Sequence, residues 1–187
     1  MGVLYKLKTI FGEHPRVICE RGHIAVHLWT DVHGDGTVCT VGMSGEAQVV
    51  APGHSCPSRE PRTELMALCR TSNAEILGSL LLDLAAYPFE HGEYLFWYQI
   101  VPLGKTLVTG SNVEGVLLSM PPIRADEMTF TNDGHRIDIV WVVPILLEEM
   151  DNARRNGIQA LEDYLENSNI DVADVRRPKR WGQSGRA

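Results

Sequence analysis

A histidine and a cysteine that stand two residues apart, His54 and Cys56, are residue types from which a nucleophilic site can be built. Catalysis by cysteine requires a thiolate, which a neighbouring histidine helps to generate. Both residues fall in the stretch 49–61, whose Pro, Gly and Ser content is typical of a loop. A solvent-exposed loop cysteine explains the pair without catalysis. The sequence favours that interpretation, and no catalytic residue is assigned.

Two further segments match only part of a functional motif. Residues 103–106 include Gly-Lys-Thr, but a phosphate-binding loop also needs a glycine five residues before Gly104, where Gln99 stands. Residues 42–45, Gly-Met-Ser-Gly, resemble a nucleophile elbow, yet Glu46 occupies the position of the closing glycine. Neither segment predicts an enzyme.

Metal-ligating residue types are present without the spacing that a metal site needs. The segment 31–36 resembles the start of a calcium loop, but its twelfth position is Gly42 instead of a bidentate glutamate. His23 and His27 would share one face of a strand about 13 Å apart, too far to bind one ion. No CxxC pair occurs among Cys19, Cys39, Cys56 and Cys69. We therefore expect neither a metal nor another cofactor.

The composition predicts one globular domain with unevenly distributed charge. The chain has 187 residues, 44% hydrophobic and 22% charged. It has no apolar run long enough to span a membrane, and its first residues do not match the pattern of a signal peptide, so we expect a cytoplasmic protein without membrane association. Residues 176–187 carry five positive and no negative side chains, whereas 1–175 hold 12 basic and 24 acidic ones. We expect 1–175 to be a single domain that repels nucleic acid and attracts a basic partner, followed by a flexible basic tail.

The elements that must position these residues alternate between strands and helices. Apolar residues at helical spacing predict helices over 1–11, 73–86, 145–156 and from Ile158 onward. Ser72 and Glu75 predict a capping box at the start of the second helix, and we expect Pro88 to end it. Strands are predicted over 23–29, 38–43, 62–69, 94–101, 113–120, 128–131 and 137–143. This order predicts an α+β domain with a central mixed, mostly antiparallel sheet flanked by helices.

Five short segments follow the order of the motifs of one known family. They are Thr40-Val-Gly-Met-Ser44, Arg62-Thr-Glu-Leu-Met66, Leu84-Ala-Ala-Tyr-Pro-Phe-Glu-His91, Gly115-Val-Leu-Leu-Ser-Met-Pro-Pro122 and Asp174-Val-Arg-Arg-Pro178. Each is weakly specific alone, but together and in this order they resemble the Suppressor of fused family in its bacterial single-domain form. In one departure, Gln99 stands where bacterial members often have a histidine, so no role of that imidazole is expected.

The resemblance implies an α+β fold and a protein-binding domain, not an enzyme. It further implies an immunity protein that neutralises a partner toxin by stoichiometric binding, without a cofactor, and the acidic body suits a basic toxin. One alternative is a regulatory adaptor that binds a transcription factor or peptide by β-strand addition. A second alternative is a hydrolase that uses Cys56 and His54. We expect a monomer or a weak dimer.

The candidate interaction residues come from the matched segments and from aromatic and acidic positions. They are Gly42, Met43, Ser44, Glu64, Trp97, Glu148, Glu149, Asp174 and Arg177. The first three either line a binding edge or end a strand. Glu64 lies in an apolar strand, where a carboxylate needs a partner, and Arg176 or Arg177 is the expected one.

The aromatic and acidic candidates each allow two interpretations. Trp97 belongs to the aromatic run 94–98, which strand alternation would divide between core and surface, and exposed members would anchor an interface. The stretch 148–174 holds eight acidic and two basic residues. It is either a docking face for the partner or a solvated helix surface.

Overall fold

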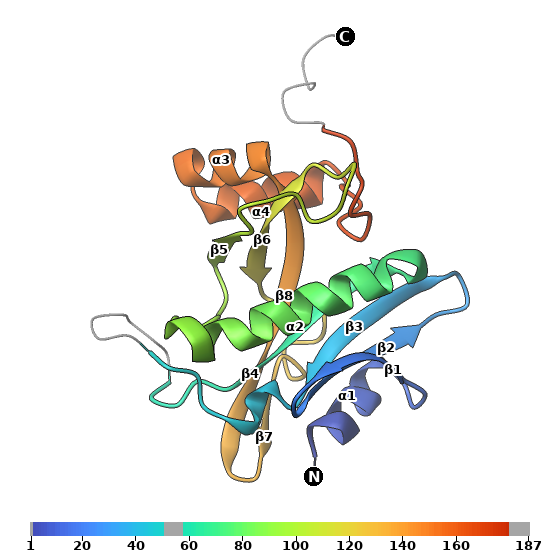
Figure 1. Cartoon of the computed structure of the whole chain (residues 1–187), viewed down its shortest axis with the longest axis vertical. Coiled ribbons are helices and arrows are strands. Elements are labelled where there is room, and N and C mark those ends of the chain that lie inside the picture. The colour runs from blue at the N-terminus through green and yellow to red at the C-terminus, as the bar shows by residue number, and fades with distance from the viewer. Residues whose placement is uncertain (1, 51–57, 180–187) are drawn as a thin grey trace.

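The described residues, 2–50 and 58–179 of the computed structural model, are centred on an eight-stranded sheet. Its strands follow the order β1-β2-β3-β4-β8-β6-β5, and β7 pairs with β8 outside this path (Figure 1). The strands are β1 Arg16–Arg21, β2 Ile24–Thr30, β3 Asp35–Val41, β4 Thr63–Arg70, β5 Gln99–Pro102, β6 Val113–Ser119, β7 Thr129–Asn132 and β8 His135–Leu146. The β4–β8 pair is parallel, and the other pairs in this sheet are antiparallel. The predicted mixed, mostly antiparallel α+β fold is confirmed.

The helices cover both faces of this sheet. They are α1 Val3–Phe11, α2 Ala74–His91, α3 Leu147–Asn156 and α4 Ile158–Asn167, with short 3-10 turns η1 Met43–Gly45 and η2 Thr71–Asn73. In β6, Val116 and Leu118 belong to the core beneath α2, whereas Leu117 packs with α3 and α4. Because successive strand residues point to opposite faces, α2 lies on one face and the α3–α4 pair on the other. In Figure 1, α2 crosses the sheet and α3 and α4 lie at the end near β5 and β6.

Helix α2 begins and ends differently from the prediction. The predicted capping box of Ser72 and Glu75 is not formed. The N-cap residue is Asn73, and its side chain makes no capping hydrogen bond. Its amide instead contacts the C-terminal segment, where Nδ2 donates to the Ala173 carbonyl oxygen at 3.5 Å. Pro88 does not end the helix. It is buried in the last turns, where its missing N–H removes one helical bond, and the helix stops at the left-handed Gly92.

Two strand predictions also differ from the structure. The sequence does not predict strand β1. This strand lies at an edge of the sheet and is mostly exposed, and its segment begins and ends with charged residues, so it lacks the apolar alternation of a half-buried strand. The aromatic run 94–101 contributes only its last three residues to a strand, since β5 begins at Gln99. Tyr98 has a φ of 65°, which is incompatible with a continuous strand. Across the described parts of the chain, no helix has the length and apolar character needed to cross a bilayer.

Candidate functional site

The carboxylate of Glu64, in β4, lies at the centre of the first group of candidate residues. Its side chain is fully buried, and Oε1 accepts hydrogen bonds from the Gly42 amide at 3.1 Å and from the Ser44 amide and hydroxyl at 3.1 and 2.6 Å. Oε2 accepts from the Thr40 hydroxyl at 2.6 Å. The segments 40–44 and 62–66, matched separately in the sequence, thus form one hydrogen-bonded unit.

The expected ion pair of Glu64 with Arg176 or Arg177 is wrong. No described residue forms an ion pair with Glu64, and its charge is stabilised by neutral donors alone. Burial raises the pKa of Glu64, while the hydrogen bonds from Ser44, Thr40 and Gly42 oppose that rise. An acid in this setting holds the turn and the strand together.

Backbone geometry explains the residue types of the turn that faces Glu64. Gly42 has a φ of 112°, and a Cβ atom there would lie 2.3 Å from the His23 carbonyl oxygen. Arg62 holds the other side of the turn, because its Nη1 donates to the Ser44 and Gly45 carbonyl oxygens at 2.9 and 2.7 Å. Met43 is fully buried. These residues end a strand and pack in the core, so the structure supports the structural interpretation of 42–44.

A second pair of candidate residues, Glu149 and Arg177, forms a buried ion pair. Arg177 Nη2 lies 2.6 Å from Glu149 Oε2, and the two residues are 4% and 2% exposed. The same carboxylate oxygen accepts from the Leu146 amide at 2.8 Å, which caps the start of α3. Burial raises the pKa of Glu149, and the nearby guanidinium opposes the rise.

The ion pair places Arg177 in the packed body and not in a flexible tail. Val175, two residues before Arg177, is fully buried. Its carbonyl oxygen accepts a hydrogen bond from the Ser111 hydroxyl at 2.6 Å. The packed part of the chain therefore extends beyond the predicted boundary at 175. Residues 180–187 of the basic segment lie outside the described residues.

The remaining candidates are Trp97, Asp174 and Glu148. Trp97 is half-buried, and its Nε1 donates to the Ile139 carbonyl oxygen at 2.9 Å. Asp174 accepts from the Arg176 amide at 2.8 Å and shapes the C-terminal turn. Glu148 lies half-buried in the first turn of α3. Glu148 and Asp174 thus adjoin the Glu149–Arg177 pair, where the Asp174 carbonyl oxygen accepts from the Arg177 amide at 3.1 Å. The nine candidates form this cluster and the one around Glu64, with Trp97 assigned to neither, and they do not form one surface.

The candidate catalytic pair cannot be placed, since His54 and Cys56 lie outside the described residues. The other cysteines are free thiols. Burial raises the pKa of the Cys69 thiol to about 11, and burial also raises the pKa of Cys39 and Cys19. Such thiols are poor nucleophiles at neutral pH. Within residues 2–50 and 58–179, no three metal-ligating side chains gather in one group.

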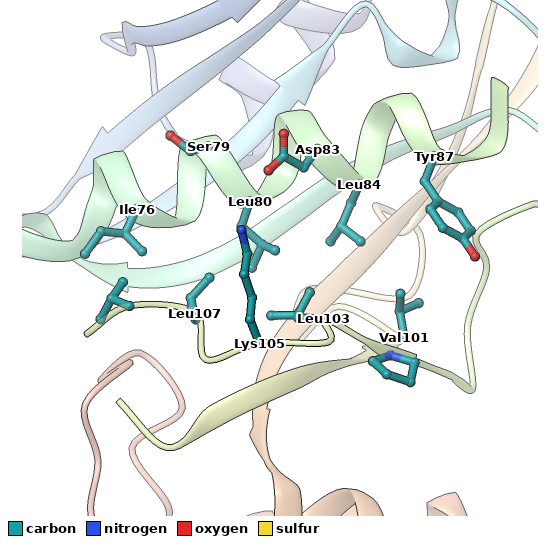
Figure 2. Close-up of a pocket in the computed structure, with 12 residues that line it drawn as sticks. Ile76, Ser79, Leu80, Asp83, Leu84, Tyr87, Val101, Leu103, Lys105 and Leu107 are labelled. Atoms are coloured by element: carbon teal, nitrogen blue, oxygen red, sulfur yellow. The ribbon is translucent and has the colours of Figure 1, made fainter. Parts of the chain in front are cut away.

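Two grooves that the sequence did not predict offer room for a partner. The first, named here the α2 groove, has a volume of about 530 Å³ and lies between α2 and the segment 101–108. Figure 2 shows Leu80 and Leu84 of the helix facing Leu103 and Leu107, with Lys105 extending toward α2. On its rim, Asp83 is in an ion pair with Arg21 at 2.7 Å.

The second groove, named the α4 groove, has a volume of about 510 Å³ and lies between α4 and the face of β6 and β8. Leu117, Trp141 and Val143 form its floor, and Glu162, Asp163 and Glu166 form its rim. The rim residues fall in the acidic stretch 148–174 singled out from the sequence, whereas these three floor residues do not. The floor could not be found in the sequence, because it depends on pairing between two distant strands.

Comparison with known proteins identifies the fold and the family. The description "Suppressor of fused protein (SUFU)" belongs to the family profile that matches residues 22–178. A SUFU homolog from Neisseria gonorrhoeae is similar in structure, with a TM-score of 0.70 and 17% identity over 95% of this chain and 93% of that one. The comparison with curated proteins found no match.

Two further solved structures share the fold at low sequence identity. A chain of the Sufu–Fu complex has a TM-score of 0.66 and 14% identity, over 91% of this chain and 83% of that one. Drosophila Suppressor of Fused has a TM-score of 0.58 and 15% identity. The match covers 83% of this chain but 42% of the Drosophila chain, so the domain described here corresponds to part of that protein.

Proposed function

The chain belongs to the Suppressor of fused family, and from this premise we propose that it is a non-enzymatic immunity protein that neutralises a basic toxin by stoichiometric binding. The observation that carries the proposal is its structural likeness to a chain of the Sufu–Fu complex, in which a protein of this fold is assembled with another protein. The finer role, immunity, rests on the resemblance to the bacterial single-domain form of the family.

The charge of the body supports a basic partner. Residues 1–175 hold twice as many acidic as basic side chains, 24 against 12. Part of that excess lies on α4, where Asp163 and Glu166 are exposed to solvent. Opposite charges accelerate the encounter of two proteins and favour the matching partner over others. The same negative charge opposes binding to nucleic acid.

The chemistry of the described core thiols gives no support to cysteine catalysis at those positions. Burial raises the pKa of Cys39 and Cys69, which leaves them protonated and unreactive. Free buried thiols also suit a reducing compartment, which is why the proposal places the protein in the cytoplasm.

Two steps test the proposal. Affinity capture with the tagged chain from a lysate of the source organism, at low and high salt, is followed by mass spectrometry. The captured protein is then purified, and its toxic activity is assayed against increasing amounts of the chain. Immunity predicts that inhibition saturates at equal molar amounts and weakens with salt. A captured protein whose activity is unchanged by an excess of the chain would contradict it.

The second candidate function is a regulatory adaptor that binds an extended segment by β-strand addition. It is favoured by the position of β5, which forms one end of the strand order and pairs with β6 alone among the described strands. An edge strand has free backbone groups that can pair with a partner. Strand addition at this edge predicts slower amide hydrogen exchange at Gln99, Ile100 and Val101 in the complex, and unchanged exchange there would exclude β5 as the pairing edge.

A further inference from the structure

The floor of the α4 groove is apolar because of the register between β6 and β8. Leu117 pairs with Val143, and Ser119 pairs with Trp141 on the same face. Just beyond β6, Met120 remains 41% exposed at the groove. An apolar floor with an exposed methionine is the kind of surface that takes up an apolar side chain.

The rim of the same groove carries negative charge that nothing in the described chain neutralises. Glu166 follows Asp163 by three residues and Glu162 by four, and all three line the groove from α4. No Lys or Arg lines the groove, and none of the three is in an ion pair with another described residue. Glu162 accepts from the Ser119 hydroxyl and Asp163 from the Gln159 amide at 3.0 Å. Neutral donors hold Glu162 and Asp163 in place and leave their negative charge available to a partner.

We propose that the α4 groove docks a basic, amphipathic segment of the partner protein. An apolar side chain of that segment enters the floor between Leu117 and Trp141, and its flanking Lys or Arg residues pair with the rim carboxylates. The inference rests on the proposed function, because the segment is taken to belong to the basic toxin. It adds which surface of the chain makes the contact and what the toxin presents there.

Charge complementarity distinguishes this groove from the α2 groove of similar volume. There, Asp83 is already paired with Arg21, and Lys105 brings a positive charge to the same opening. The α2 groove therefore selects neither charge. A basic partner gains from the α4 groove both burial of apolar area and new ion pairs.

A peptide titration tests the groove directly. The probe is a short synthetic peptide of leucine and lysine at helical spacing, and its matched control has glutamate in place of lysine. We expect the lysine peptide to shift the amide NMR signals of Leu117, Trp141 and Leu165, and the control peptide to leave them unchanged. Shifts confined to another surface, or the same shifts with both peptides, would overturn the proposal.

Charge-neutralising variants sharpen the test without touching the core. Asp163→Asn with Glu166→Gln removes two rim charges, and Glu13→Gln with Glu20→Gln removes two exposed charges beside and within the distant edge strand β1. We expect the rim variant to bind the lysine peptide about fivefold more weakly and the β1 variant to bind it like the wild type. If both variants bound the peptide equally weakly, binding would depend on the net charge of the protein and not on the groove. That result would overturn the proposed docking site.

A substitution at the mouth of the groove gives an independent readout. Met120→Lys places a positive charge beside the rim at an exposed position, so the fold should tolerate it, which a thermal melt checks. Peptide binding is expected to be lost. Wild-type affinity in the folded Met120→Lys variant would contradict the proposal.

The two proposals can fail separately. If capture yields a neutralised basic toxin that binds the rim and β1 variants equally, the groove is wrong and immunity stands. If the lysine peptide docks in the groove but the captured protein is not inhibited, immunity is wrong and the groove stands as a site for basic segments.

Discussion

Ser44 donates two hydrogen bonds to one oxygen of Glu64, through its backbone amide at 3.1 Å and its hydroxyl at 2.6 Å. Together with the Gly42 amide and the Thr40 hydroxyl, they give the buried carboxylate four donors, and no cation of residues 2–50 or 58–179 pairs with it. Buried carboxylates without a charged partner are costly unless such donors surround them. The contact therefore explains both the turn after β3 and the acid within β4.

Removing this carboxylate is expected to destabilise the fold in a graded way. Glu64→Ala leaves all four donors unsatisfied and should lower the free energy of unfolding by about 3 kcal/mol or more. Glu64→Gln keeps one oxygen toward the donors at Gly42 and Ser44 and should lower it by about 1 kcal/mol. Urea denaturation measures both changes. Equal stability of the two variants would contradict the assigned role of the oxygens.

The same residue should make stability depend on pH with a defined sign. Because burial raises the folded-state pKa of Glu64, its contribution to stability is fully present below the unfolded value, near 4.5, and declines as the pH rises through the folded value. The stability advantage of the wild type over Glu64→Gln should therefore shrink from acidic to alkaline pH. Urea denaturation of both proteins from acidic to alkaline pH measures this difference in stability. A difference that grows with pH would contradict the predicted direction.

Gly42 should tolerate no side chain. A Cβ atom there would meet the His23 carbonyl oxygen at 2.3 Å, and its φ of 112° is strained for any other residue. We expect Gly42→Ala to lower the free energy of unfolding by about 1–3 kcal/mol. Gly45 is the matched control in the same turn, because nothing lies within 4 Å of its added Cβ. If Gly42→Ala and Gly45→Ala had similar melting temperatures, the backbone would have shifted to avoid the contact with the His23 carbonyl oxygen, and the prediction would be wrong.

Local sequence patterns were sufficient for most elements but not for contacts between them. The apolar stripe of α2 and the turn between β7 and β8 are short-range signals, and both elements are present in the structure. The union of 40–44 with 62–66 depends on the β3–β4 register, in which Cys39 pairs with Met66. No local pattern contains that register, which is why an arginine was expected beside Glu64.

The errors at the ends of elements arise from tertiary contacts. Asn73 replaces the expected capping box because its side chain contacts Ala173 and Arg176, about a hundred residues away. Pro88 stays helical because the apolar face of α2 is buried there. The α4 groove combines strands and a helix that are distant in sequence, so only its acidic rim was visible beforehand.

The two buried cysteines, Cys39 and Cys69, should resist alkylation in the folded protein. Burial raises the pKa of Cys69 to about 11 and raises that of Cys39 as well, so few thiolates form near pH 8. Iodoacetamide labelling followed by peptide mass spectrometry should find both residues unmodified until urea unfolds the chain. Native labelling of Cys39 at the rate of the unfolded chain would mean that this part of the core opens readily.

Removing one member of the buried Arg177–Glu149 ion pair should destabilise the fold much more than replacing both members with apolar residues. Arg177→Met leaves the Glu149 charge buried without its cation and is expected to cost about 3–5 kcal/mol. Adding Glu149→Met should restore most of that loss, because two apolar side chains need no ion partner. The recovery will be incomplete, since Glu149 also accepts from the Leu146 amide at the start of α3. Urea denaturation of the wild type, both single variants and the double variant measures the coupling. Additive losses would show that the two charges do not depend on each other.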